Sequence, residues 1–104
     1  MYKILMCCYF GASTSVLNEK MEKIIEENHL DIKIKVTSIH EIDEEMKKED
    51  YQMILLGPQV SYRRKTLEKK YSPFHVKVMA IDSDDYGMMN AKKIIQKIED
   101  EINE

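Results

Sequence analysis

The stretch YKILMCCYFGASTS, residues 2–15, decides the fold of this 104-residue chain. Residues 2–7 are largely apolar and predict a β-strand. A glycine and a run of hydroxyl residues follow, and from residue 16 apolar side chains recur at helical spacing. A strand that leads through a short glycine loop into a helix opens a β-α-β unit. The stretch therefore predicts an α/β protein with a parallel sheet.

The rest of the chain continues this alternation. Further strands are expected at residues 32–36, 53–56 and 76–81. Helices are expected up to about residue 28, after a capping box that starts at Ser38, from about residue 60 to 70, and from near Tyr86 onward. Their apolar faces are predicted to carry Val16, Leu17, Met21, Ile24 and Ile25; Ile42 and Met46; and Ala91, Ile94, Ile95, Ile98 and Ile102.

The charge pattern of the strands predicts their order. Residues 32–36 and 76–81 carry lysines and suit the edges of a sheet, whereas residues 53–56 are continuously apolar and suit its middle. The simplest order is 2-1-3-4, with helices on both faces. In that order the winding reverses between the first and third strands, where ligands of open α/β sheets bind. All three glycines of the chain lie in loops expected at this edge: residues 8–15, 57–59 and 82–87.

Cys8 is the candidate nucleophile of this edge. It opens the run CYFGASTS, residues 8–15, in which the next helix begins. Backbone N–H groups at a helix N-terminus attract anions, and the same field favours thiolate over thiol. These features predict a phosphate-binding loop made of Tyr9, Phe10, Gly11, Ala12, Ser13, Thr14 and Ser15 around a phosphocysteine at Cys8.

Composition limits the remaining classes of function. Charged residues make up 34% and hydrophobic residues 43%, and the formal net charge of −3 argues against nucleic-acid binding. No segment approaches the roughly 20 apolar residues that span a bilayer, and no signal peptide is recognisable. We expect one domain over residues 1–104, located in the cytoplasm and not itself membrane-spanning.

The second cysteine and the three histidines are expected to have structural or surface positions and not to bind a metal. Cys7 faces away from Cys8 along the strand and is expected to be buried. Two adjacent sulfurs without spaced partners do not complete a metal site, and His29, His40 and His75 are expected at the surface. No metal or cofactor is expected.

Two reactions suit a thiolate in an anion-binding loop. Low-molecular-weight tyrosine phosphatases and arsenate reductases use the pattern C-x-x-x-x-x-R-S, but here Thr14 and Ser15 stand where Arg-Ser would be. Without the arginine, no bidentate clamp stabilises the transferring phosphoryl group. The loop therefore favours a phosphoryl carrier over a phosphatase-like protein. A thiol-based regulatory or redox protein, with Cys7 and Cys8 as sensors, is a further alternative.

The chain resembles the IIB components of phosphoenolpyruvate-dependent sugar phosphotransferase systems, of the lactose/cellobiose/chitobiose type. Three segments carry the resemblance: CYFGASTS at residues 8–15, LLGPQVSY at residues 55–62, and Ile81-Asp82-Ser83 followed by Tyr86-Gly87. Their order and spacing agree over essentially the whole chain. Tyr9 and Phe10 depart from the small residues usual after the family's cysteine, and Cys7 is an additional departure.

The resemblance implies a four-stranded parallel sheet similar to that of low-molecular-weight tyrosine phosphatases, and a phosphotransferase function. The implied roles are that Cys8 takes phosphate from a phosphohistidine on a IIA protein and passes it to a sugar entering through the membrane component IIC. The sugar would be a β-linked disaccharide such as cellobiose, chitobiose or lactose.

Further residues are expected near the site. Gln59 stands where the third helix begins and is a candidate for binding, while Asp82 either anchors its loop or lies near the phosphate. Tyr62 and Tyr86 are interpreted as packing residues whose hydroxyls can reach the site. All four residues are candidates for contacts around the site or with a partner protein. Tyr9 and Phe10 either contact a partner or fold back on neighbouring loops. The basic group Arg63, Arg64, Lys65, Lys69 and Lys70 and the acidic clusters at residues 41–50 and 99–104 are expected on solvated surfaces.

Overall fold

A computed structural model describes residues 1–8 and 11–103, with the backbone alone for residues 11–14. Its strands are β1 (Tyr2–Cys8), β2 (Ile32–Ser38), β3 (Met53–Leu56) and β4 (Lys77–Ala80). Its α-helices are α1 (Gly11–Glu27), α2 (Ile42–Lys48), α3 (Arg64–Tyr71), α4 (Ser83–Gly87) and α5 (Ala91–Ile102). Short 3-10 helices are η1 (Ile39–Glu41), η2 (Pro58–Arg63) and η3 (Ser72–Phe74).

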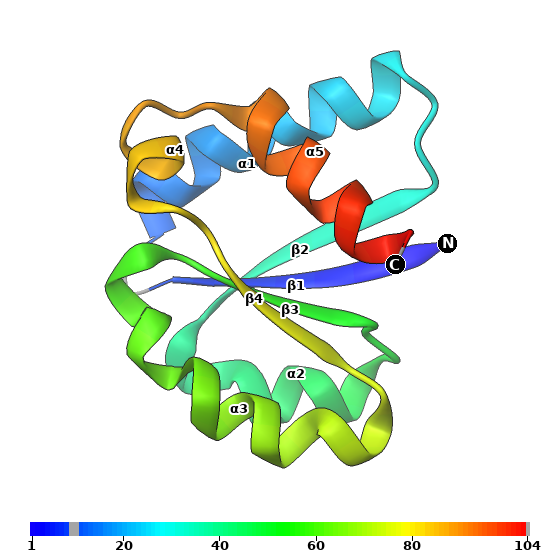
Figure 1. Ribbon diagram of the computed structural model, residues 1–104, viewed down its shortest axis with the longest axis vertical. Coiled ribbons are helices and arrows are strands. Elements are labelled where there is room, and N and C mark those ends of the chain that lie inside the picture. Colours follow the sequence, from blue (N-terminus) through cyan, green and yellow to red (C-terminus); the bar gives the residue numbers. More distant parts are fainter. Residues whose placement is uncertain (9–10, 104) are drawn as a thin grey trace.

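The strands form a parallel sheet in the order β2-β1-β3-β4, which confirms the predicted 2-1-3-4 order and fold class. In the register, Cys8 lies opposite Ser38 on β2, and Cys7 lies opposite Leu56 on β3. The carboxyl ends of all four strands point to the same edge, which is at the left of Figure 1. The loops predicted to form the site therefore leave from one edge of the sheet.

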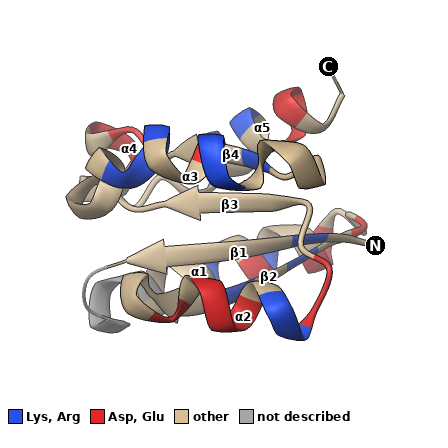
Figure 2. Ribbon diagram, turned by 90° about the horizontal axis from the view of Figure 1, so that it is seen from below, with Lys and Arg blue, Asp and Glu red and all other residues tan. Residues whose placement is uncertain are grey.

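Helices cover both faces of the sheet, as Figure 1 shows. Helices α1, α4 and α5 lie on one face, where Leu17, Met21 and Ile94 pack against Leu55. Helices α2 and α3 lie on the other face, where Ile42 and Leu67 belong to a second apolar cluster. Figure 2 shows that β3 and most of β1 are free of charged residues. That composition matches their central position, where both faces are covered.

Three details of the predicted elements are wrong. The helix expected from near Tyr86 is two helices, because Met89 adopts a left-handed conformation (φ 50°) and Asn90 then caps α5 by accepting a hydrogen bond from the backbone N–H of Lys93 at 3.2 Å. The helix expected from residue 60 begins as the 3-10 helix η2. Val16 is exposed, although its spacing places it on the apolar stripe of α1.

A partly buried ion pair joins the two C-terminal helices. Asp85 of α4 is buried and accepts a hydrogen bond from Lys97 of α5 at 2.8 Å, with Lys93 at 3.7 Å. The hydrogen bond from Lys97 lowers the pKa of Asp85 below its ordinary value, against the effect of desolvation. This pair fixes α4, and with it the loop that follows β4.

Stability is expected to fall in acid through this pair. The folded state lowers the pKa of Asp85. The ion pair's contribution to the free energy of unfolding is therefore complete above the ordinary pKa of 3.8, and it is lost as the pH falls through the folded pKa. Urea unfolding at about pH 7 and about pH 3 measures the loss, and Asp85→Asn should show a smaller difference between the two than wild type. Asp84→Asn, an exposed change on the same helix, is the control. An unchanged difference in Asp85→Asn would contradict the prediction.

Candidate active site

Cys8 is the last residue of β1, and its side chain is 3% exposed. Helix α1 begins at Gly11, so the thiol precedes a helix N-terminus by three positions. The first backbone N–H groups of a helix have no intrahelical partner and are suited to binding an anion. Of the predicted phosphate loop, Tyr9 and Phe10 lie outside the described residues. Gly11, Ala12, Ser13 and Thr14 form the first turn of α1, and Ser15 is exposed.

Cys7 belongs to the apolar cluster under α2 and α3 and is completely buried, which confirms its predicted burial. Desolvation raises the pKa of the Cys7 thiol, the neighbouring Cys8 raises it further, and Arg63 lowers it in part. Adjacent Cα atoms are about 3.8 Å apart, shorter than the roughly 4.4–6.8 Å that a disulfide usually spans. A buried thiol with a raised pKa is inert, so the geometry disfavours a redox switch between Cys7 and Cys8.

The turn after β3 lies against Cys8. The backbone N–H of Gly57 donates to the carbonyl of Cys7 at 2.9 Å. A Cβ atom on Gly57 would lie 3.6 Å from Cys8 Cβ and 3.4 Å from Gln59 Oε1. The glycine thus leaves room where the side chains of Cys8 and Gln59 approach each other. This places Gln59 near Cys8, at the edge where the sequence predicts it.

The effect of replacing Gly57 is expected to depend on the size of the new side chain. Alanine fits at ordinary van der Waals distance and the φ of −65° suits any residue, so Gly57→Ala should stay near wild type. The branched side chain of Gly57→Val must extend toward Cys8 and Gln59. The phosphoryl acceptance that the sequence predicts for Cys8 should then be roughly tenfold slower in Gly57→Val than in wild type, by misplacement of reacting groups. The rate of labelling measures the effect, and circular dichroism checks that both variants are folded. Equal labelling rates for Gly57→Ala and Gly57→Val would contradict the expectation that the space beside Gly57 is needed.

The other predicted residues have different surroundings. Asp82 caps α4, because its Oδ1 accepts from the backbone N–H of Asp84 at 2.9 Å. Tyr86 is half-buried and packs against the α1–α5 core. Tyr62 is 70% exposed on η2, so its interpretation as a packing residue is wrong, while its candidacy for a partner contact stays a prediction. Its position in a turn at the sheet edge, rather than on an apolar helix face, explains this exposure.

A cavity of about 320 Å³ opens beside Cys8 on the side of β2. It lies there because the register sets the end of β2 beside the end of β1. Its lining residues are Cys8, Lys35, Val36, Thr37, Ser38, Glu41 and Glu45. Sequence reasoning missed this cavity, although the predicted strand order and the capping box at Ser38 together indicate which residues border Cys8.

Glu45 departs from the prediction that residues 41–50 form a solvated acidic cluster. It is 6% exposed and pairs with Lys35 at 2.8 Å and Lys48 at 3.4 Å, and it accepts from the Tyr51 hydroxyl at 3.3 Å. The hydrogen bond from Lys35 lowers the pKa of Glu45. These partners compensate the charge of Glu45, which is why a carboxylate is tolerated in this position.

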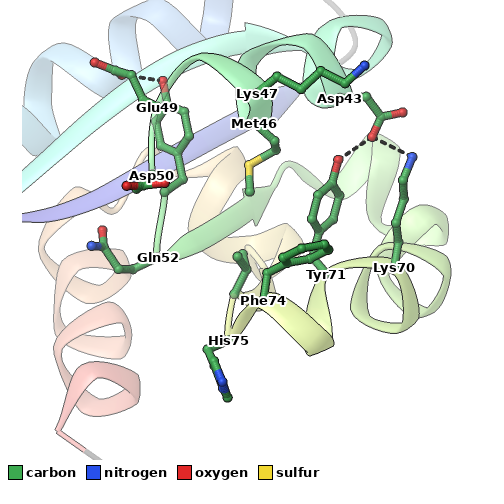
Figure 3. A pocket seen from close by; sticks show the side chains of 12 residues that line it. Asp43, Met46, Lys47, Glu49, Asp50, Gln52, Lys70, Tyr71, Phe74 and His75 are labelled. Atoms are coloured by element: carbon green, nitrogen blue, oxygen red, sulfur yellow. Dashed lines mark hydrogen bonds and ion pairs between the residues drawn. The ribbon is translucent and has the colours of Figure 1, made fainter.

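A larger cavity, of about 670 Å³, lies between α2 and α3 at the amino ends of β3 and β4 (Figure 3). Met46, Tyr71 and Phe74 surround it in Figure 3. Asp43 on its rim is already paired with Lys70 at 2.8 Å and with the Tyr71 hydroxyl. None of the predicted site residues lines this cavity, which is at the opposite edge of the sheet from Cys8.

The described residues hold no group of three histidine, cysteine or acidic side chains that could bind a metal ion. His29, His40 and His75 are exposed, as predicted. In residues 1–8 and 11–103, no helix has the length and apolar character needed to cross a bilayer.

Sequence comparisons find similar proteins along nearly the whole chain. The family model described as "PTS system, Lactose/Cellobiose specific IIB subunit" matches residues 3–97. The oligo-beta-mannoside-specific EIIB component of Bacillus subtilis is 33% identical, with 93% of this chain and 92% of the relative covered. The galactose-specific and cellobiose-specific EIIB components of Lactococcus lactis are 35% and 34% identical, each with 96% of this chain and 95% of the relative covered.

Solved structures with this fold include two similar proteins. The cellobiose-specific IIB component from Borrelia burgdorferi has a TM-score of 0.71 and 29% identity, with 91% of this chain and 85% of that chain covered. The lactose-specific IIB domain from Streptococcus pneumoniae has a TM-score of 0.77, with 92% and 95% covered, and its 14% identity supports the fold alone.

Proposed function

Because the chain belongs to the lactose/cellobiose-specific IIB subunits of the sugar phosphotransferase system, we propose that Cys8 is the residue that carries its phosphoryl group. The observation that carries the proposal is the position of Cys8 at the end of β1, just before the start of α1 and against Gly57. A thiol in that position combines a nucleophile with the anion-binding end of a helix.

The donor is a phosphohistidine on a IIA protein. The Cys8 thiolate attacks phosphorus in line, so that the S–P bond forms as the N–P bond of the phosphohistidine breaks, and the released imidazole takes up a proton. Backbone N–H groups at the start of α1 hold the phosphoryl oxygens. The sequence also offers Ser13, Thr14 and Ser15 as further candidates for hydrogen bonds to phosphate. No oxidant or further co-reactant is needed.

The acceptor is a sugar presented by the membrane component IIC, whose hydroxyl displaces Cys8 and restores the thiol. Two relatives are named for the β-linked sugars oligo-beta-mannoside and cellobiose, which supports a sugar of the β-linked disaccharide class, such as cellobiose, chitobiose or lactose. A third relative is named for galactose, a monosaccharide. Thr14 stands where a phosphatase would carry arginine, so hydrolysis is not favoured by a bidentate clamp. These steps take place on the cytoplasmic side, with one domain formed by residues 1–104.

The test is transfer of radiolabelled phosphate from a phosphorylated IIA protein. We expect one phosphoryl group per chain, located on the peptide that contains Cys8, and a bond with the lability of a thiophosphate ester. Addition of IIC and sugar should then remove the label as sugar phosphate. Retention of the label on a histidine or serine peptide would contradict the proposal.

A further inference from the structure

Glu41 and Cys8 line the same cavity of about 320 Å³. Two interactions fix the position of Glu41 relative to Cys8. Cys8 pairs with Ser38 across the sheet, and the Ser38 hydroxyl caps η1 by accepting from the backbone N–H of His40 at 3.2 Å. Glu41 is the last residue of that short helix. The sheet register therefore brings Glu41 to the cavity that Cys8 also lines.

Glu41 carries the uncompensated charge of the cavity wall. Three charged residues line the cavity, and two of them neutralise each other, because Lys35 pairs with Glu45 at 2.8 Å. Lys48 adds a second cation to Glu45 at 3.4 Å. Within residues 1–8 and 11–103, the Glu41 carboxylate has no ion-pair partner. Its negative charge therefore acts on whatever Cys8 carries.

Phosphorylation of Cys8 replaces a thiol or a singly charged thiolate by a group with a charge near −2. A neighbouring carboxylate opposes this added charge more strongly than it opposes the unphosphorylated sulfur. We propose that Glu41 raises the phosphoryl-transfer potential of Cys8, so that the group moves on to an acceptor and does not accumulate on the chain. The inference rests on the proposed function and assigns Glu41 an electrostatic role in it.

The experiment measures the equilibrium ratio of phosphorylated chain to phosphorylated IIA. Neutralisation in Glu41→Gln should raise this ratio, and charge reversal in Glu41→Lys should raise it further. A carboxylate and a phosphoryl dianion that face one solvent-open cavity give an expected change of roughly three- to tenfold. The increase should shrink as salt is added, because the interaction crosses solvent. A merely structural role would not produce this order or this salt dependence.

Glu44→Gln is the matched control. Glu44 lies three residues after Glu41, is exposed on α2 and does not line the cavity. Its replacement by glutamine changes the net charge by the same amount as Glu41→Gln. Equal ratios for wild type, Glu41→Gln and Glu41→Lys would overturn the inference, as would an equal increase in Glu44→Gln. Wild type that accepts no label at all would instead overturn the proposed function, and the inference with it.

Discussion

Replacing Cys8 with serine is expected to abolish acceptance of phosphate from phosphorylated IIA. A serine hydroxyl at this position keeps the size and location of the side chain but removes the thiolate. None of the histidines lines the described cavity beside Cys8, so no imidazole lies there to activate the hydroxyl. We expect the initial rate of labelling to fall by three orders of magnitude or more, on the order of 4 kcal/mol in the barrier. Label per folded chain is the quantity to measure.

Cys7→Ser is the matched control for this change, one position away. Cys7 is buried on the opposite face, so its loss should leave the rate of phosphoryl acceptance close to that of wild type. The variant does place a hydroxyl in an apolar environment, which lowers the free energy of unfolding by about 1–3 kcal/mol. Cys7→Ala avoids that penalty and separates the two effects.

The pair of cysteine variants discriminates between the remaining functions. A carrier requires Cys8 alone, whereas a redox sensor would require both thiols and would show oxidant-dependent thiol loss without phosphoryl acceptance. Labelling that survives in Cys8→Ser, or that disappears in a folded Cys7→Ala, would overturn the assignment of the nucleophile.

Much of the fold was predictable because the periodicity of apolar residues follows directly from burial. Strand β2 alternates lysine with Ile32, Ile34 and Val36, and β3 is apolar throughout, which together predict an edge strand and a central strand. The strand order then predicts which loops meet. The approach of Gln59 to Cys8 at Gly57 follows from that order.

The features that were missed depend on contacts between distant residues. The break between α4 and α5 requires Met89 in a left-handed conformation, which few residues other than glycine adopt and which helical periodicity does not reveal. The burial of Glu45 depends on Lys35, ten residues earlier on a neighbouring strand. The cavity beside Cys8 likewise combines residues from β1, β2, η1 and α2. No local pattern specifies such groupings.

Leu55→Ala is expected to be the most destabilising substitution among those considered. Leu55 is fully buried on central strand β3, where it lies opposite Met6 and Met79 in the register and faces the core beneath α1 and α5. Truncation of a leucine in such a site costs about 2–5 kcal/mol, from lost transfer free energy and the cavity that remains. That is a large share of the 5–15 kcal/mol, roughly, that stabilises a domain. Urea unfolding monitored by circular dichroism measures the difference.

Val16→Ala tests whether burial, and not apolar spacing, determines the effect. The sequence places Val16 on the apolar stripe of α1, yet the side chain is 44% exposed. Its truncation should therefore change the free energy of unfolding by about 0.5 kcal/mol or less. Both variants should retain the wild-type slope of stability against urea, since the same surface is exposed on unfolding. Equal losses in Leu55→Ala and Val16→Ala would contradict the assignment of Leu55 to the core. We expect Leu55→Ala to lose more free energy of unfolding than Val16→Ala, while its folded fraction still accepts the phosphoryl group. That result would show that Leu55 acts on stability and Cys8 on the reaction.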